Sequence, residues 1–288
     1  MKKKFKLKAG LNRSIGGNIF VYFFIILMSV IFIFPFVYAV VNSLKPIDEL
    51  LIFPPRLYVT NPTLNNYAEL FRLAANSLIP LSRYFVNTLI IALSITLGTI
   101  VIASMAAYPL AFGKFPGKDK IFSLVVTSLL FVGTVTAAPS YVVVSTFGLL
   151  DTYWAIILPA FGASMGVFLM KQFMEQIPYA VVEAATVDGC TEFSCLVRIV
   201  LPLVRPAWLT LCIFVFPGAW SNTGGAYIFS EEIKLLPVAI SELTAGAGVA
   251  RMGVAAASGV IMMIPSLIIF IISQSSILET MATAGIKE

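Results

Sequence analysis

The chain has 288 residues, of which 59% are hydrophobic and 11% charged, and its formal net charge is +5. Water-soluble domains carry roughly 25% charged residues, so this composition excludes a fold whose whole surface faces water. The sequence contains no His, the commonest metal ligand. Its three cysteines have no metal-ligand spacing, and we interpret them as reduced thiols: Cys190, Cys195 and Cys212. We therefore predict an all-α polytopic membrane protein.

The N-terminal segment 1–18 is basic, and a long apolar run follows at 19–41. A helix over this run is about 34 Å long, which is enough to cross a bilayer. A cleaved signal peptide would have an apolar stretch of about 7–15 residues and a small-residue cleavage site. The run is longer and continues into the polar residues 42–46, so we predict that it is a retained span.

Five further apolar runs follow, and the predicted spans are 84–112, 121–139, 153–170, 207–220 and 254–272. A proline-bearing connection, 42–83, precedes the second span. A polar, helix-forming insert, 171–206, separates the fourth span from the fifth. The six spans form one predicted transmembrane domain, 19–273, and a tail follows at 274–288.

The basic residues orient these spans. If the N-terminus is cytoplasmic, thirteen of the nineteen Lys and Arg residues fall in cytoplasmic segments and six on the opposite side. An excess of Lys and Arg in short loops marks the cytoplasmic side of a membrane protein. We therefore predict that both termini and the insert 171–206 are cytoplasmic.

The insert has a helix–glycine–helix pattern. Pro178 suits the first turn of a helix, and Gly189 suits its end, where a residue often adopts a positive φ. A second short helix has apolar residues at helical spacing, namely Phe193, Leu196, Val197 and Val200. Pro202 and Pro206 then interrupt the backbone before the fifth span. The residues alone predict an elbow at the membrane surface.

Seven residues of the insert also follow a fixed spacing: Glu183, Ala184, Ala185, Gly189, Ile199, Leu201 and Pro202. This pattern resembles the signature loop of permease subunits of binding-protein-dependent ABC importers. In that family the loop is a coupling helix that docks on the ATP-hydrolysing subunit. The resemblance implies that these residues, with Asp188, form an ATPase-coupling loop, and that Glu183 pairs with a basic residue of the partner. Cys190 departs from the small Ala usual there, and an interfacial elbow without a partner is the alternative.

Several other stretches resemble the carbohydrate permeases of this family. They are Thr63–Tyr67, Phe85–Thr88, Ala106–Phe112, Phe147–Thr152 and Phe216–Asn222. Pro109 and Gly113 depart from the family pattern, and Ser221 is inserted in the last stretch. The tail Thr283–Lys287 is similar to that of the shorter permease subunit of maltose-type importers, which reaches the ATPase dimer interface. The resemblance therefore implies that Thr283, Gly285 and Lys287 lie at that interface.

The resemblance implies a transport subunit of a bacterial or archaeal cytoplasmic membrane rather than an enzyme. Its expected partners are a second permease, an ATPase dimer and an extracytoplasmic solute-binding protein, with a sugar or oligosaccharide as the solute and no nucleic acid. The sequence has no Gly-rich Walker loop, so we expect no cofactor on this chain, with ATP and Mg²⁺ in the partner ATPase. Alternating access is the implied mechanism.

Four residues are candidates for the solute pathway. Trp220 and Asn222 offer a ring for a sugar's apolar face and an amide for its hydroxyls. Trp220 is equally interpreted as an interfacial anchor. Thr134 and Tyr141 are the other two candidates. Hydroxyls inside a span, such as Thr127, Thr134 and Thr136, either face the pathway or bond back to their own helix.

Other functions remain as alternatives. The spans lack acidic residues well inside them, which argues against an ion-coupled carrier. A polytopic membrane enzyme would need paired carboxylates, a His, or a nucleophile with a base, and the sequence shows no such group. An ABC permease for a non-sugar solute and a channel-like or structural membrane protein also remain open.

The predicted topology is testable by cysteine labelling in intact cells. Cysteines introduced near Asn65 and Thr223 should react with an impermeant reagent added outside, because these connections are predicted to lie outside. Cysteines near Lys118 and Glu192 should react only after the membrane is opened. Labelling near Glu192 from outside would contradict the coupling interpretation, because ATP-driven partners act from the cytoplasm.

Overall fold

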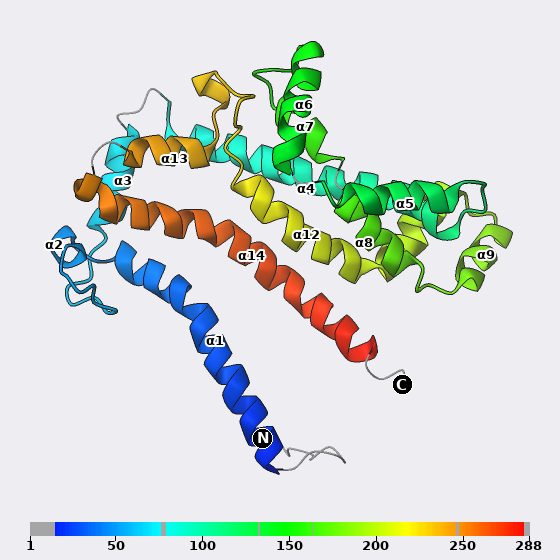
Figure 1. Cartoon of the computed structure of the whole chain (residues 1–288), viewed down its shortest axis with the longest axis horizontal. Helices are drawn as coiled ribbons and strands as arrows, with labels where there is room; N and C mark the ends of the chain where they lie inside the picture. The colour runs from blue at the N-terminus through cyan, green and yellow to red at the C-terminus, as the bar shows by residue number, and fades with distance from the viewer. Residues whose placement is uncertain (1–14, 76–78, 132, 163, 246–247, 285–288) are drawn as a thin grey trace. The chain divides into compact units, whose positions relative to one another are not determined.

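The computed structural model describes residues 15–75, 79–131, 133–162, 164–245 and 248–284 (Figure 1). No strand occurs in this part of the chain, which confirms the predicted all-α class. The helices of nine or more residues are α1 (Ile15–Ser43), α3 (Asn65–Ala75), α4 (Leu81–Phe112), α5 (Lys118–Ser128), α6 (Gly133–Thr146), α8 (Ser164–Met174), α9 (Tyr179–Val187), α12 (Arg205–Trp220), α13 (Leu236–Thr244) and α14 (Met252–Ala284). The shorter ones are α2 (Ile47–Leu50), α7 (Trp154–Ala160), α10 (Glu192–Cys195), α11 (Leu201–Leu203), a π-helical turn (Leu196–Val200) and two 3-10 turns (Glu231–Ile233 and Gly248–Arg251).

Three of the described helices are long and apolar enough to cross a bilayer, namely Gly16–Ser43, Leu81–Phe112 and Met252–Gln274. The number rises to six if each of three bent helix pairs crosses as one span. These pairs are α5 with α6, α7 with α8, and Glu192–Leu203 with α12. The arrangement is that of a polytopic membrane protein. The six-span count and the cytoplasmic termini stay predictions.

Two predicted spans are interrupted in the structure. Within 121–139, α5 ends at Ser128, and Leu129 and Leu130 continue in tighter turns whose N–H groups bond three residues back. α6 then runs through Pro139 to Thr146, past the predicted end of the span. Within 153–170, α7 ends at Ala160, just after its internal Pro159. Helix breaks of this kind are missed when spans are assigned from hydropathy alone, because hydropathy carries no information about backbone bonding.

The chain divides into two compact units. Unit 1 comprises the described residues of Met1–Glu69 and Gly248–Val260. Its centre is Asn66, whose amide donates to the carbonyls of Ser43 and Lys45, at 2.8 Å in both cases. The Asn66 side chain lies so close to Gly253 that a Cβ there would collide with it. The start of α14 is thereby packed against the turn that follows α1.

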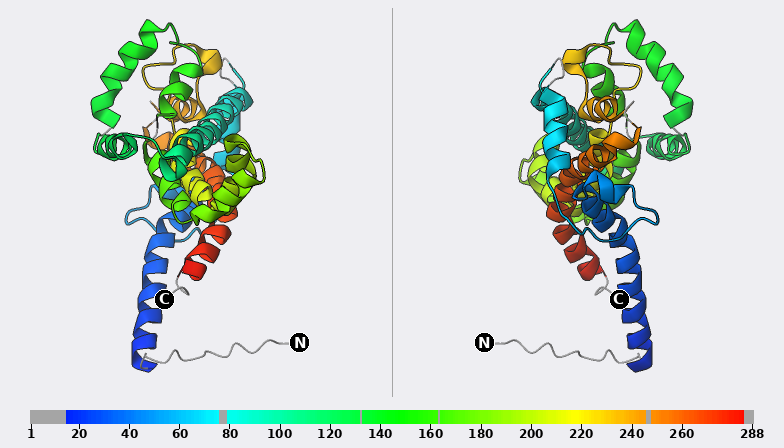
Figure 2. Two further views of the ribbon diagram at one scale, coloured as in Figure 1. Left: turned by 90° about the vertical axis from the view of Figure 1, so that its right-hand side faces the viewer. Right: turned by 90° about the vertical axis from the view of Figure 1, so that its left-hand side faces the viewer.

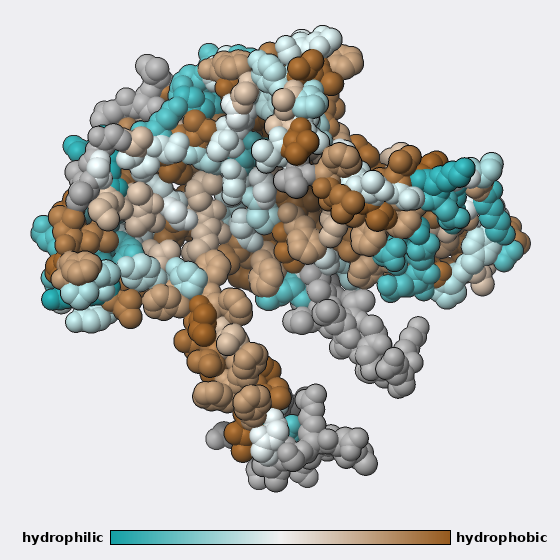
Figure 3. All heavy atoms as spheres, in the orientation of Figure 1, coloured by the Kyte–Doolittle hydropathy of each residue, from teal (hydrophilic) through white to brown (hydrophobic). Residues whose placement is uncertain are grey.

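The surface of α1 is apolar on all sides. None of the 18-residue window that defines this candidate span is buried inside the protein, and its exposed residues include Phe20, Phe32 and Phe36. Figure 3 shows this apolar surface along the helix. A helix that is apolar all round requires an apolar surrounding, which the bilayer supplies.

Unit 2 comprises the described residues of Leu70–Ala247 and Ile261–Glu288, and it is built around α4. The 32-residue α4 packs most extensively against α8 and α12. Gly166 of α8 lies directly against α4, where an added Cβ would come within 3.0 Å of the Ala103 Cβ. Small residues allow this close approach, as is usual for helices that associate in membranes.

Two apolar clusters pack along α4. One lies toward its N-terminal end and includes Tyr84, Ile91 and Trp220. The other lies toward its C-terminal end and includes Ala103 and Ala107. α4 thus connects the two ends of unit 2.

Candidate functional site

The predicted elbow, residues 178–206, is present at the C-terminal end of α4. Pro178 stands immediately before α9, and the helix continues to Val187. The Lys114 ammonium lies 4.8 Å from the centre of the Tyr179 ring, so the link that follows α4 contacts the first residue of α9. A cation over an aromatic face is attracted by the negative charge of the ring's π face.

Gly189 ends α9 as expected. Its φ is +82°, a left-handed conformation that costs little for Gly and more for other residues. The Gly189 N–H donates to the Thr186 carbonyl and the Cys190 N–H to the Ala185 carbonyl, both at 3.0 Å. These two bonds make a Schellman turn, which satisfies carbonyls that the helix end would leave unpaired.

The second half of the elbow is less regular than a single short helix. The hydroxyl of Thr191 caps α10 by accepting from the Ser194 N–H at 3.3 Å. A π-helical turn and α11 follow. The segment Glu192–Leu203 then meets α12 at an angle of 80°, and Pro206 stands in the first turn of α12, where a missing N–H costs nothing.

The elbow is fixed to the helical core by one face. Val182, Ala185 and Cys195 are buried, together with Leu196 and Val200, and they pack in the cluster around Ala103, Ala107, Met170 and Met174. The opposite face is open. Of the predicted coupling residues, Glu183, Ala184, Asp188, Gly189 and Pro202 are exposed, Ile199 and Leu201 are half-buried, and Ala185 is buried.

Two exposed apolar side chains flank the Gly189 turn, and their exposure was not predicted from the sequence. The spacing placed Phe193 on one apolar face with Leu196, Val197 and Val200, but only Leu196 and Val200 are buried. Val187 is 82% exposed and Phe193 is 65% exposed, on either side of the Gly189 turn. Their exposure could have been inferred from the sequence, because both apolar residues stand close to a turn that was predicted to be polar. Between α9 and α10 lies a hollow of about 580 Å³, lined by the predicted coupling residues Ala184, Asp188, Gly189 and Ile199 and by Ser194 and Arg198. The elbow therefore presents an open, mixed polar and apolar surface.

Two of the three predicted tail residues lie outside the described part of the chain. Thr283 belongs to the last turn of α14. Gly285 and Lys287 lie outside the described residues.

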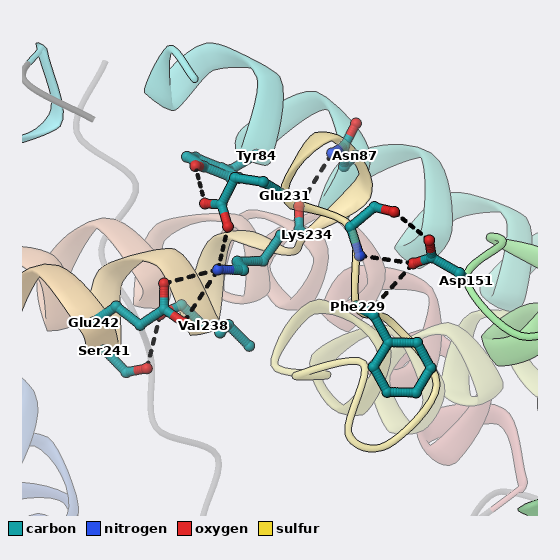
Figure 4. A network of polar contacts seen from close by, with 10 residues as sticks. Tyr84, Asn87, Asp151, Phe229, Glu231, Lys234, Val238, Ser241 and Glu242 are labelled. Atoms are coloured by element: carbon teal, nitrogen blue, oxygen red, sulfur yellow. Dashed lines mark hydrogen bonds and ion pairs between the residues drawn. The ribbon is translucent and has the colours of Figure 1, made fainter. Parts of the chain in front are cut away.

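A second group of polar residues, the polar clasp, lies at the N-terminal end of α4 (Figure 4). Its members are Tyr84, Asn87, Asp151, Tyr153, Ser230, Glu231, Lys234 and Glu242. The Tyr84 hydroxyl donates to Glu231 at 2.5 Å, and the Asn87 amide donates to the carbonyls of Glu232 and Lys234 at 2.9 and 3.0 Å. Lys234 bridges Glu231 and Glu242. The clasp holds the connection between α12 and α13 against α4.

Asp151 fastens the same connection from the loop before α7. Its carboxylate accepts from the N–H groups of Phe229 at 2.9 Å and Ser230 at 2.8 Å, and from the Ser230 hydroxyl. The Ser230 hydroxyl, with the two N–H groups, holds the pKa of Asp151 below its ordinary value. Likewise, the Lys234 ammonium and the Tyr84 hydroxyl hold the pKa of Glu231 below its ordinary value. Hydrogen bonds to a carboxylate favour its charged form.

Trp220 is packed inside unit 2. Its side chain is fully buried, stacked on Phe216 and edge-on to Phe85, and its indole N–H donates to the Met262 carbonyl at 2.9 Å. Both the ring face and the polar group are therefore used inside the protein. The roles of Trp220 as a solute contact or as an interfacial anchor stay predictions.

The other three solute-pathway candidates keep some exposure. Asn222 is half-buried, and its side-chain oxygen accepts from the Gly224 N–H at 2.7 Å. Tyr141 is exposed, with its ring centre 6.1 Å from that of Tyr227. Thr134 is exposed on α6. Thr127 and Thr136 bond to carbonyls of their own helix turns, which is the simpler of the two expectations for such hydroxyls.

Comparison with known proteins relates this architecture to a protein family. A scan against models of known protein families finds no match. Among curated proteins, the sulfoquinovosyl glycerol transport system permease protein SmoH of Agrobacterium fabrum is 30% identical over 259 residues, which are 88% of this chain and 89% of the relative. The chain belongs to the permease subunits of ABC importers. The permease is also 29% identical over 268 residues to the arabinooligosaccharides transport system permease protein AraQ of Bacillus subtilis, covering 92% of this chain and 94% of AraQ.

A solved structure shares the fold of this permease. It is the crystal structure of a bacterial ABC transporter involved in the import of the acidic polysaccharide alginate, with a TM-score of 0.74 at 18% identity. The match covers 92% of this permease and 99% of that chain. The permease therefore has the fold of that ABC transporter chain.

Asp151 offers a test of the polar clasp, because its φ of +59° is unusual for a residue with a side chain. Asp151→Gly and Asp151→Ala both remove the carboxylate, but Ala adds backbone strain that Gly avoids. We expect the thermal unfolding midpoint in detergent to fall in both, and about 2–4 °C further in Asp151→Ala.

The same pair tests the role of the Asp151 charge. The pKa of Asp151 is lowered in the folded state, so its stabilisation is present above the unfolded-state pKa and is lost as pH falls through the folded-state pKa. The difference in midpoint between the wild type and Asp151→Gly should therefore shrink on acidification. A difference that does not change with pH would show that the carboxylate contributes nothing through its charge.

Proposed function

We propose that this permease imports a sugar or oligosaccharide, delivered by a solute-binding protein, and that an ATPase dimer drives it through alternating access with a second permease subunit. The names of the relatives support the solute class, because SmoH and AraQ are permeases for sulfoquinovosyl glycerol and for arabinooligosaccharides. In this proposal ATP and Mg²⁺ are bound by the ATPase, since the chain has no Walker loop.

The ATP-driven part of the proposal is supported by the burial pattern of the elbow. One face of it is buried against α4 and α8, so a force on the elbow is transmitted to helices of the core. The other face presents Glu183, Ala184 and Asp188 beside a hollow and two exposed apolar side chains. Exposed apolar residues rimmed by charged ones are typical of a protein-binding surface.

We propose distinct roles for the predicted residues of the elbow. The small side chain of Ala184 leaves the exposed face of α9 flat, so that the helix lies close to the ATPase. Glu183 pairs with a basic side chain of that partner, and such a pair strengthens as the interface excludes water. Gly189 sets the turn through its left-handed backbone, while Ile199, Leu201 and Pro202 shape the segment that leads to α12. Asp188 contributes a second acidic group beside the hollow.

Gly189→Asp with Gly189→Asn as its control tests the coupling role. Asn has nearly the shape of Asp and tolerates a positive φ, but it carries no charge. An added Cβ at Gly189 meets no atom within 4 Å, so neither variant creates a clash within the chain. We expect Gly189→Asp to abolish solute uptake and copurification of the ATPase, and Gly189→Asn to retain part of both. Membrane insertion should be unchanged in both, because the elbow lies outside the lipid.

Glu183→Ala should weaken coupling less severely than Gly189→Asp, because it removes one ion pair and leaves the turn intact. The measurements are ATPase copurification and uptake by whole cells. Normal assembly with normal uptake in Gly189→Asp would contradict the proposal and leave the elbow without a partner.

The tail provides an independent test of the ATPase interface. We propose that Thr283, Gly285 and Lys287 contact the ATPase dimer, and that removal of residues 283–288 therefore weakens ATPase association while the permease still inserts. Copurification of the ATPase and stimulation of its activity by solute are the measurements. If both are unchanged after truncation, the tail is a frayed terminus rather than a contact.

A binding screen with the solute-binding protein tests which class of solute is transported. The cognate solute-binding protein should bind a sugar or oligosaccharide in a calorimetric screen that also contains amino acids, polyamines and other small polar solutes. Binding of a non-sugar solute alone would favour the alternative permease function and would leave the ATP-driven mechanism unaffected.

A further inference from the structure

The loop between α2 and α3 exposes an unusual group of apolar side chains. Five large apolar residues lie within eight positions, and we call the segment Leu51–Tyr58 the apolar loop. The exposed fractions are 54% for Leu51, 37% for Ile52, 93% for Phe53, 61% for Leu57 and 63% for Tyr58. An exposed apolar group of this kind marks an interaction site, because water hydrates such side chains at a cost.

Two charged side chains hold the base of the apolar loop. Lys45 is almost completely buried, and its ammonium donates to the Asn42 side-chain oxygen at 2.8 Å and to the Arg56 carbonyl at 2.5 Å. Glu49 is also buried, and its two carboxylate oxygens accept from the N–H groups of Thr60 at 3.0 Å and Asn61 at 2.9 Å. Buried charges are tolerated when they are well hydrogen-bonded.

These contacts determine where the apolar side chains point. Lys45 binds the middle of the apolar loop, and Glu49 binds the chain just after it. The backbone is therefore held on both sides, while the described residues of unit 1 leave the apolar side chains exposed. The exposure of Phe53 is a consequence of this fixed backbone.

The apolar loop follows the end of a helix that is long enough to cross a bilayer. α1 ends at Ser43, and its 29 residues give it a length of about 43 Å, which exceeds the roughly 30 Å of the hydrocarbon core. The Lys45–Asn42 bond ties the loop directly to the last turn of α1. Figures 1 and 2 show the chain after α2 spreading sideways from this end of α1. The apolar surface of the loop thus continues the exposed apolar surface of α1.

We propose that the apolar loop inserts into the lipid boundary beside α1 and anchors this end of the span. Phe53, Leu51 and Leu57 would enter the outer part of the acyl region. Tyr58 has an apolar ring and a polar hydroxyl, which suits the headgroup level. The Arg56 guanidinium would lie among the lipid phosphates, with its aliphatic stem along the apolar region.

The composition of the apolar loop favours lipid over a protein partner. Interfacial anchors combine aromatic and aliphatic side chains with a basic residue at a fixed depth. The loop has this combination, and its continuity with α1 places it beside the surface that the bilayer must cover. The proposal rests on the membrane embedding of α1 and is independent of the coupling role of the elbow.

Site-directed spin labelling of the full chain tests the proposal. The three native cysteines are replaced by Ala, and a nitroxide is attached in separate variants carrying Phe53→Cys, Tyr58→Cys or Asp48→Cys. Asp48 is the matched control, because it is exposed on α2 and polar. The permease is purified with its associated subunits and reconstituted in nanodiscs of phosphatidylethanolamine and phosphatidylglycerol. Collision rates are measured with oxygen, which concentrates in lipid, and with a nickel chelate, which stays in water.

We expect the nitroxide at Phe53→Cys to collide several-fold more often with oxygen than with the nickel chelate, and the nitroxide at Asp48→Cys to show the reverse. Tyr58→Cys should be intermediate, because it lies at headgroup level. A Phe53→Cys label that is as accessible to nickel as the control would show a loop in water. A label that is protected from both reagents would show that a protein covers the loop. Either result would overturn the proposal.

The variant Glu49→Gln tests whether the Glu49 carboxylate holds the base of the apolar loop in place. The substitution keeps the shape of Glu49 but replaces a charge-assisted acceptor by a neutral amide, so its bonds to Thr60 and Asn61 weaken. We expect the Phe53→Cys nitroxide to become more mobile and its preference for oxygen to fall in this background. An unchanged spectrum and an unchanged preference would show that Glu49 does not position the loop.

Discussion

A peptide group inside hydrocarbon has no water to bond with, and this constraint governs the whole chain. Each crossing segment must satisfy its N–H and C=O groups within itself, which is why the apolar stretches of this permease are helical. Polar side chains with several hydrogen-bond partners lie at the ends of the apolar stretches, in the polar clasp and after the end of α1. The constraint thus separates the chain into apolar crossings and polar ends.

The two ends of unit 2 use their polar groups differently. At the clasp, charged side chains pair with one another and with backbone groups of the same chain. The connection between α12 and α13 is therefore held by contacts within the chain. At the elbow, Glu183 and Asp188 remain exposed while the apolar residues beneath them are buried. The first arrangement fixes a loop, and the second leaves charge available to a partner. The contrast explains why the elbow is the better candidate for communication between subunits.

Local chemistry allowed much of the elbow to be predicted. Pro178 and Gly189 have backbone preferences that act within a few residues, so the start of α9 and its left-handed end follow from the sequence. Thr191 also carries a local signal, since Thr before an acidic residue is a common helix start. The π-helical turn at Leu196–Val200 had no comparable signal, because it depends on how the segment packs against α4.

The sequence by itself determined the class of protein, the position of the apolar segments and the resemblance of the elbow to the permease signature loop. Hydropathy, helix-end preferences and motif spacing are properties of the chain alone. Tertiary structure decided which residues face inward. Trp220 could have faced solute or lipid, and it is buried because Phe85, Phe216 and the Met262 carbonyl meet it from elsewhere in the fold. The apolar loop is likewise exposed because Lys45 and Glu49 bind backbone groups eleven or twelve residues away. Such contacts join distant parts of the chain, and no local preference encodes them.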